Sequence, residues 1–222
     1  VNTANGWMTL WNSSRVVSAE GSFTPQGKTY DATAKGIEWN VTIPKDLPGT
    51  AALYYFDDCV IGMNGTGFAR QFMDCVTNWA LDVSPGCEGR LLWKENYVPP
   101  DESVIMRTAG LGDPESRVFA RYIQTTRQWV GFSMDTGKNI WEAEPMQPFD
   151  YFTFGTVWDG KLYDIAYGGI LYCIDFKTGE TLWKHEIKDF YNENLFANTW
   201  GSYSDLFIAD GKVYIGTGEH SP

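Results

Sequence analysis

The chain has 222 residues, of which 43% are hydrophobic and 16% aromatic, a content that argues for a folded domain and against disorder. Its net charge of −11 comes without a cluster of Lys or Arg, so nucleic-acid binding is not expected, because phosphate contacts need concentrated positive charge. No segment approaches the roughly 20 consecutive apolar residues of a membrane span, and none has the form of a signal peptide.

Short runs rich in β-branched and aromatic residues, separated by turn residues, predict strands along most of the chain. In chain order the predicted strands are Ala51–Tyr55, Cys59–Met63, Phe72–Asp82 and Arg90–Tyr97, then Val104–Thr108, Val118–Thr125, Trp129–Ser133 and Asn139–Glu144, then Phe152–Val157, Lys161–Tyr167, Ile170–Asp175 and Glu180–Ile187. Apolar residues nowhere keep a helical period over a dozen positions, so helix content should be low. An all-β fold with strands in groups of four is therefore predicted.

One pattern recurs, because Gly131–Trp141 (GFSMDTGKNIW) aligns without gaps on Cys173–Trp183 (CIDFKTGETLW). A third copy has three extra residues in its turn, and a weaker fourth copy keeps only the tryptophan. The motif positions are Trp39; Ala80, Asp82 and Trp93; Gly131, Ser133, Thr136, Gly137 and Trp141; and Cys173, Asp175, Thr178, Gly179 and Trp183. The four tryptophans are 54, 48 and 42 residues apart, a spacing typical of the four-stranded antiparallel blades of a β-propeller.

A second repeat supports this placement of the blades along the chain, since Val157–Tyr163 (VWDGKLY) recurs as Ile208–Tyr214 (IADGKVY). Asp-Gly between apolar runs is a strong hairpin signal, because both central residues of a type I′ turn need positive φ. The repeats divide the chain into a partial blade with a long loop at 1–48, blades at 49–100, 101–147 and 148–200, and the start of a further blade at 201–222. The third whole blade includes a long connection.

Each motif position has an expected mechanical role. The small residue should let its strand pass close to the next blade, the Asp or Ser should bond the turn backbone, and Thr-Gly should supply a positive φ. The tryptophan offers a flat apolar face and one N–H donor, so each of them, Trp183 included, should dock its blade on the next. The motif is therefore predicted to be structural.

The pattern Ala-x-Asp-x-x-Thr-Gly-x-x-x-Trp resembles the tryptophan-docking motif of the quinoprotein, or PQQ-like, β-propellers. That family contains PQQ-dependent dehydrogenases and also propellers that bind no quinone, among them a lipoprotein of bacterial outer-membrane assembly. The chain looks most like the non-catalytic, secreted or surface-attached PQQ-like repeat proteins common in archaea. The resemblance implies a ring of seven or eight blades. The chain is therefore expected to be a fragment of such a ring, or to need further blades or subunits to close it.

Three glycosylation sequons begin at Asn12, Asn40 and Asn64. All three fall at predicted loops or outer strands, where a glycan could be carried. With the resemblance, they favour an extracellular or cell-surface location.

The four cysteines have no metal-type spacing. Cys59 and Cys75 lie on strands predicted to be hairpin partners, so they are the predicted disulfide in an oxidising compartment, with Cys75–Cys87 as a competing pair. Cys173 occupies the small position of the motif and is expected to be a buried free thiol.

A PQQ enzyme would need Ca²⁺ held by oxygen ligands beside the quinone, and a carboxylate base. The resemblance to alcohol dehydrogenases also implies a pair of adjacent cysteines, which this chain lacks. Asp82 and Asp175 are assigned to turns, and Asp57-Asp58 is interpreted as a solvated hairpin end. No catalytic, cofactor-binding or metal-binding residue is predicted.

The remaining chemical candidates are two histidines and two loops. His185 is expected to be exposed on an outer strand, and His220 to lie nearer the ring axis, neither with an assigned metal role. The segments Lys188–Trp200 (KDFYNENLFANTW) and Asn12–Thr33 could bind a partner, but packing over the blade edges is the favoured interpretation.

We therefore predict a non-catalytic, secreted or cell-surface propeller that acts as a scaffold or as a protein- or glycan-interaction module without a cofactor. Two alternatives remain. One is part of a PQQ- and calcium-dependent quinoprotein dehydrogenase whose ligands lie in other blades. The other is a structural component of a surface layer or filament.

Overall fold

The structure is a computed structural model that describes residues 1–16, 32–49, 52–64, 71–72, 75–100, 105–147, 153, 155–191, 193, 199–202 and 206–216. Within them the chain is almost entirely β, and every paired strand is antiparallel. Helical structure is limited to η1 (Ser13–Arg15) and α1 (Ala32–Gly36). Neither has the length or the apolar character of a membrane span, and no other described segment is helical.

The strands form three blades between two half-blades. The first half-blade holds β1 (Trp7–Trp11) and β2 (Ile37–Thr42), and the last holds β16 (Phe207–Ala209) and β17 (Lys212–Tyr214). Between them lie β3 (Ala52–Tyr55), β4 (Cys59–Met63), β6 (Val76–Asp82) and β7 (Leu91–Tyr97); β8 (Ile105–Asp113), β9 (Val118–Ile123), β10 (Gln128–Ser133) and β11 (Asn139–Glu142); and β12 (Thr156–Trp158), β13 (Lys161–Asp164), β14 (Ile170–Asp175) and β15 (Thr181–Glu186).

The predicted groups of four strands are confirmed, with one difference in strand pairing. Phe72, predicted at the start of the strand that ends at Asp82, lies instead in the two-residue strand β5 (Gln71–Phe72). β5 pairs with β8 and so belongs to the sheet of the following blade. The Asp-Gly hairpins are also confirmed, since Asp159-Gly160 and Asp210-Gly211 all have φ between 50 and 67°.

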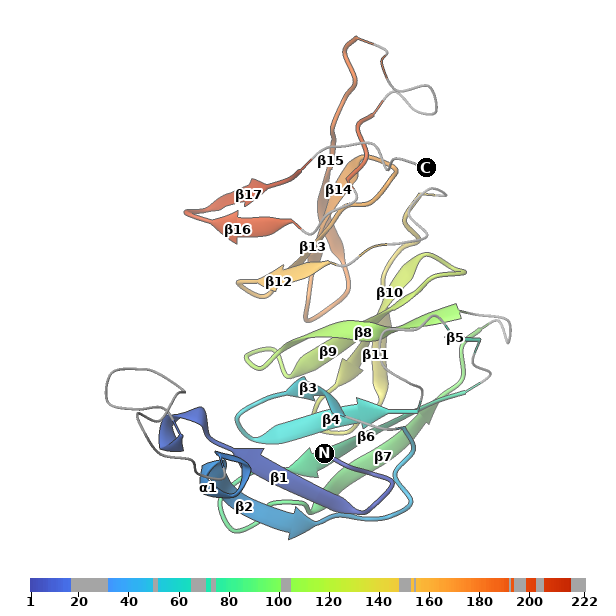
Figure 1. Cartoon of the computed structure of the whole chain (residues 1–222). Coiled ribbons are helices and arrows are strands. Elements are labelled where there is room, and N and C mark those ends of the chain that lie inside the picture. Colours follow the sequence, from blue (N-terminus) through green and yellow to red (C-terminus); the bar gives the residue numbers. More distant parts are fainter. Residues whose placement is uncertain are drawn as a thin grey trace.

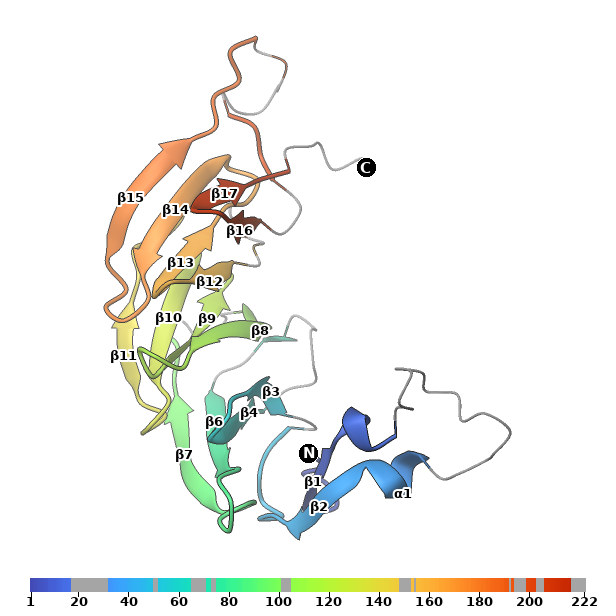
Figure 2. The ribbon, with the colours of Figure 1, turned by 90° about the vertical axis from the view of Figure 1, so that its left-hand side faces the viewer.

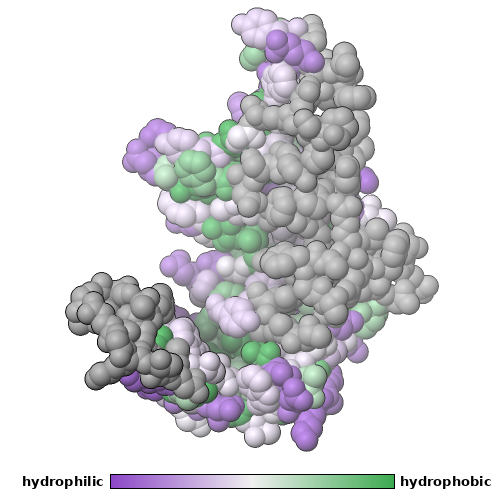
Figure 3. Space-filling view, in the orientation of Figure 1, coloured by the Kyte–Doolittle hydropathy of each residue, from purple (hydrophilic) through white to green (hydrophobic). Residues whose placement is uncertain are grey.

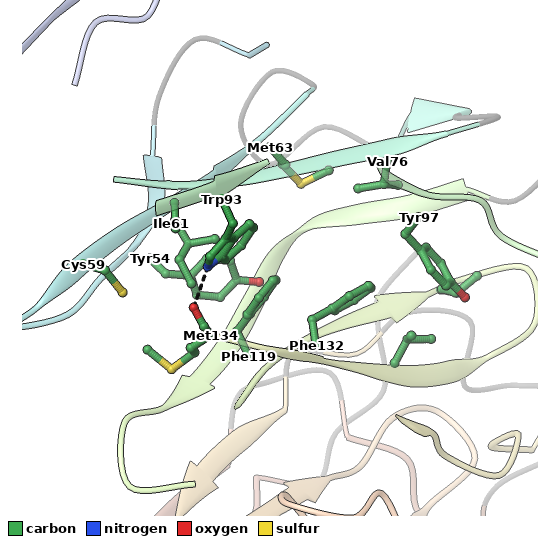
Figure 4. Close-up of a cluster of buried hydrophobic side chains, with 13 residues drawn as sticks. Tyr54, Cys59, Ile61, Met63, Val76, Trp93, Tyr97, Phe119, Phe132 and Met134 are labelled. Carbon is green, nitrogen blue, oxygen red and sulfur yellow. Dashed lines mark hydrogen bonds between the residues drawn. The ribbon is translucent and has the colours of Figure 1, made fainter. Parts of the chain in front are cut away.

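The blades follow one another along an arc, each sheet packed face to face on the next (Figures 1 and 2). The first half-blade lies at one end of the arc and the last half-blade at the other. Apolar side chains fill each gap between neighbouring sheets. The core between the first two whole blades includes Tyr54, Ala80, Trp93, Phe119 and Phe132 (Figure 4).

Trp93 spans the gap between the first two whole blades. Its indole Nε1 donates a 2.7 Å hydrogen bond to the Met134 carbonyl at the end of β10 (Figure 4). Its ring covers Gly137 so closely that a Cβ there would lie 2.4 Å from it. Gly137 has φ +71°, so the turn needs glycine for its backbone as well as for the space.

Trp141 repeats this contact one blade further on. Its Nε1 donates to the Phe176 carbonyl at 3.2 Å, and a Cβ on Gly179 would lie 2.7 Å from its ring. The small motif residue lies under the same ring. Gly131 is the strand partner of Trp141, and a Cβ on Gly131 would lie 2.0 Å from the indole. Close passage of this strand to the next blade was the wrong reason for the small residue. It is small because its own tryptophan lies across it.

Trp183 does not dock, contrary to the expectation from its motif. Its side chain is 42% exposed, whereas Trp93 and Trp141 are 8% and 7% exposed. The reason is positional: the half-blade of β16 and β17 beyond it has no third and fourth strand among the described residues, and the covering turn in other blades joins those two strands.

Trp93→Ala should lower the free energy of unfolding by about 3 to 5 kcal/mol, because it removes a buried aromatic ring and leaves a cavity between two blades. Urea denaturation followed by circular dichroism measures the change. Trp158→Ala is the matched control: this half-exposed tryptophan on β12 should cost less than about 1 kcal/mol. Equal costs for the two variants would contradict docking by Trp93.

Candidate functional site

A groove of about 750 Å³ opens beside β14 and β15, at the end away from the motif turn. It is lined by Ile170, Lys184, His185, Glu186, Ile187, Lys188 and Phe190. The chain leaves β15 here and enters the long connection to the last half-blade. The groove is therefore formed partly by a sheet edge and partly by the start of that connection.

The connection is anchored by backbone hydrogen bonds on both sides of its exposed part. The Ile187 amide donates to the Gly169 carbonyl at 2.9 Å, and the Trp200 amide donates to the Ile187 carbonyl at 2.7 Å. The Thr199 hydroxyl donates to the Gly168 carbonyl at 2.8 Å. The turn at Gly168-Gly169 thus supports the base of the groove.

Two aromatic rings project from this anchored base. Phe190 is 82% exposed and Tyr191 is 84% exposed. The buried Asp189 positions them, because its carboxylate accepts a hydrogen bond from the Tyr191 amide at 3.1 Å in an Asx-type turn. Packing over the blade edges was the favoured interpretation for this connection, and it is wrong for these two residues.

The charges of the groove are of both signs. The Lys184 ammonium lies 2.8 Å from the Glu144 carboxylate of the preceding blade and 5.3 Å from the centre of the Tyr172 ring. The hydrogen bond from Lys184 lowers the pKa of Glu144. His185 is exposed, as predicted, and lines the groove beside Glu186. This lining suits a partner segment that is apolar in places and not strongly charged.

Of the acidic doublet Asp57-Asp58, Asp58 has a structural role. Arg117 lies 2.8 Å from Asp58 and 2.8 Å from Asp135, so it joins the Asp57-Asp58 hairpin end to the next blade. Across the described residues, no group of three or more His, Cys, Asp or Glu side chains could hold a metal ion. His220 lies outside the described residues.

The motif acids bond their turns, as predicted. Asp175 accepts hydrogen bonds from the amides of Lys177 and Thr178 at 3.0 and 2.8 Å. Asp82 accepts from the Ser84 amide at 2.9 Å and from Arg90 at 2.7 Å. Burial by itself would raise the pKa of Asp82, but these hydrogen bonds outweigh it and lower the pKa below its ordinary value.

The sequence carried no signal for Arg121, which is fully buried in β9 between two blades. Its guanidinium donates to the Asn78 side-chain oxygen at 3.0 Å and lies over the rings of Tyr54 and Phe119 at 5.3 and 5.7 Å. Burial lowers the pKa of Arg121. Its place in a strand of otherwise apolar pattern was not predictable, because the partners come from the preceding blade.

The predicted disulfide is not formed, and the strand register explains why. All four cysteines are free. Cys59 pairs with Asp82 at one end of β4 and β6, whereas Cys75 precedes the opposite end of β6. The same length of strand separates Cys75 from Cys87. Cys173 is a buried free thiol, as predicted, and burial raises the pKa of Cys59 to about 12.

The three sequon asparagines differ in their surroundings. Asn40 is exposed on β2. The Asn12 amide donates to the Glu38 carboxylate at 2.6 Å, and the Asn64 amide donates to the Cys75 carbonyl at 2.9 Å. Among the three, Asn40 is the one best placed to carry a glycan.

No protein-family model matches the chain, and no curated protein matches it either. Among solved structures, BamB from Moraxella catarrhalis superposes with a TM-score of 0.51 and 12% identity, over 82% of this chain and 50% of that one. The chain has a β-propeller fold. A quinohemoprotein alcohol dehydrogenase from Pseudomonas putida HK5 gives a TM-score of 0.43 and 18% identity, over 72% of this chain and 31% of that one. A europium-containing methanol dehydrogenase gives a TM-score of 0.42 and 15% identity, over 72% of this chain and 38% of that one.

At these identities the likeness concerns the fold alone. The chain spans half or less of the length of each of these structures. A function for this chain therefore has to be inferred from its own surface.

Acid should weaken the bond between Asp82 and its turn. Because the folded-state pKa lies below the ordinary value of 3.8, the stabilisation is present above that value and is lost as pH falls through the folded-state pKa. Asp82→Asn should lower the free energy of unfolding by about 1 kcal/mol at neutral pH. The gap from the wild type should close as pH falls below the ordinary carboxyl pKa and through the lowered pKa of Asp82. Urea denaturation at stepped pH measures it, and a gap that is independent of pH would contradict this assignment.

Proposed function

We propose that the chain is a non-catalytic propeller segment that binds a protein partner through the groove beside β14 and β15 and its two projecting aromatic rings. The observation that carries the proposal is the exposure of Phe190 and Tyr191 next to that groove. Large aromatic side chains are enriched at the centres of protein interfaces, where their burial contributes much of the binding energy.

The anchoring of the connection supports this role. The Ile187 amide bonds the Gly169 carbonyl and the Thr199 hydroxyl bonds the Gly168 carbonyl, so both sides of the segment are held, and Asp189 orients the turn. The rings thus project from a fixed base, and less conformational entropy is lost when they are covered by a partner. Loops held by a rigid scaffold are where propellers and other repeat folds commonly place binding residues.

A polypeptide partner fits the lining better than a nucleic acid or a strongly acidic ligand. The apolar side chains of Ile170, Ile187 and Phe190 line the groove together with charges of both signs. The ammonium of Lys184 already bonds Glu144. A bound glycan is the competing occupant, because aromatic rings also stack on sugars.

The alternative of a PQQ dehydrogenase receives no support from the described residues. The motif acids bond turn amides, Asp58 pairs with Arg117, and Asp164 accepts a hydrogen bond from the Trp129 indole at 2.5 Å. These carboxylates stabilise the blades and their contacts. We propose a secreted or cell-surface location, supported by the exposed sequon at Asn40.

Photo-crosslinking tests the binding surface. A photoreactive phenylalanine analogue placed at Tyr191 should capture a discrete protein from an extract of the native source, and Phe190→Ala should reduce the yield at least about tenfold, the loss expected for a hot-spot aromatic. The same analogue at Trp158, exposed on β12, is the matched control and should capture nothing.

Equal yields at positions 191 and 158 would contradict the proposal. Binding to a glycan array that is abolished by Phe190→Ala would reassign the groove to sugars. Saturable binding of PQQ with Ca²⁺, detected by quenching of tryptophan fluorescence, would favour the dehydrogenase.

A further inference from the structure

The strand β15 is the outermost of its blade and has an open edge. It pairs with β14 on one side and with no described strand on the other. Figure 2 shows β7, β11 and β15 on the convex side of the arc, and each of them ends its sheet. The edges of β7 and β11 stay open although a sheet lies on both sides of each blade. Packing of blade on blade therefore covers the faces of a sheet and leaves the edge of its outer strand uncovered.

The backbone of β15 directs hydrogen-bonding groups to that edge. The Ile187 amide donates to the Gly169 carbonyl at 2.9 Å, toward β14. Alternate residues of an antiparallel strand bond the same neighbour, so Lys184 and Glu186 direct their amides and carbonyls the other way. Among the described residues, no backbone hydrogen bond outside the ladder of β14 and β15 involves Lys184 or Glu186. The edge thus offers two donors and two acceptors.

The other two outer edges are protected in ways that β15 is not. Pro99-Pro100 follows β7 after one residue, and β11 has only four residues. Prolines and short length both keep an edge strand from pairing with another chain. β15 has six residues, and its continuation through Lys188 contains no proline. Lys184 does not guard the edge, because its ammonium is held 2.8 Å from Glu144 of the preceding blade.

The groove follows this edge. Five of its seven lining residues are consecutive, from Lys184 to Lys188, and Ile170 and Phe190 complete it. Figure 3 shows hydrophilic and paler side chains together at the top of the molecule, where the connection after β15 projects in Figure 1. A groove that runs along one strand suits an extended polypeptide, because the two have the same residue spacing.

We propose that the groove takes an extended segment of its protein partner as a fifth strand, antiparallel to β15. This inference rests on the proposed function and specifies how the partner binds. The segment bonds the backbone of Lys184 and Glu186, and its flanking residues contact Ile187 and Phe190 in the groove. Strand addition of this kind takes its affinity from backbone hydrogen bonds and its specificity from alternate side chains.

The side chains along the edge select the sequence of that strand. Directly paired residues of antiparallel strands favour opposite charges. Glu186 is exposed, and among the described residues no Lys or Arg forms an ion pair with it. Glu186 therefore favours a basic residue opposite, and Lys184 favours an acidic one. In an antiparallel strand the basic residue comes first, with an apolar residue before it opposite Ile187 and the acidic residue two positions after it.

Hydrogen exchange at single amides tests the pairing, with the synthetic peptide Thr-Val-Ile-Lys-Thr-Glu-Val-Thr as the probe. At a saturating concentration of this peptide, the amides of Lys184 and Glu186 should exchange at least about tenfold more slowly, because each gains a backbone hydrogen bond. The amides of His185 and Ile187 are directed to β14 and should change much less. Nuclear magnetic resonance of the whole chain resolves the four amides.

Methylation of single backbone nitrogens in the peptide provides the matched control. On the lysine or the glutamate of the peptide it removes a donor directed to β15, and binding should weaken at least about tenfold. On the threonine between them it alters an amide that points away from β15, and the affinity should stay within about twofold.

Charge reversal tests the predicted register. Glu186→Lys should weaken binding of the peptide about threefold, and a peptide with glutamate in place of its lysine should recover the loss. Glu180→Lys is the matched control, since this exposed residue lies at the other end of β15 and outside the groove. Equal effects of the two substitutions would overturn the register.

Unchanged exchange at Lys184 and Glu186, or equal losses for the two kinds of methylated peptide, would overturn strand addition. If the photoreactive analogue at Tyr191 still captures a partner in that case, the proposed function stands and only this mode of binding fails. Protection of the two amides without any capture at Tyr191 would keep the edge as a strand-binding site and reject the proposed function.

Discussion

The arrangement of blades depends on one contact, the indole that lies between a small residue of its own blade and a glycine turn of the next. Trp141 shows all its parts: Gly131 beneath the ring, Gly179 above it, and the Phe176 carbonyl on its Nε1. A ring that fills the gap between two sheets and also bonds backbone across it sets both the spacing and the sliding position of neighbouring blades. The small residue, the turn and the tryptophan therefore form one unit.

The buried and paired carboxylates also stabilise turns and contacts between blades. Asp82 and Asp175 bond turn amides, Asp58 reaches Arg117 of the next blade, and buried Asp164 holds the Trp129 indole. Carboxylates engaged in this way stabilise hairpins and blade contacts. A repeat protein of this kind places its function on the segments that depart from the repeat.

Equivalent residues differ in burial because a propeller blade is stabilised by its two neighbours. Tyr163 and Tyr214 occupy the same position in the hairpin, yet only the first has a blade on its outer side. Trp183 and Trp141 differ for the same reason. Burial in this fold is thus a property of the order of blades along the arc, and the motif alone does not determine it.

The sequence by itself determined the local structure of this protein. The Asp-Gly hairpins, the positive φ of the motif glycines, the turn-bonding acids and the grouping of strands all follow from residues close together in the chain. The tertiary structure decided the remaining features, because these features depend on which distant segments of the chain pack against each other across the gap between two blades. It separated Cys59 from Cys75 by the strand register, buried Arg121 against the preceding blade, exposed Phe190 and Tyr191, and left Trp183 uncovered.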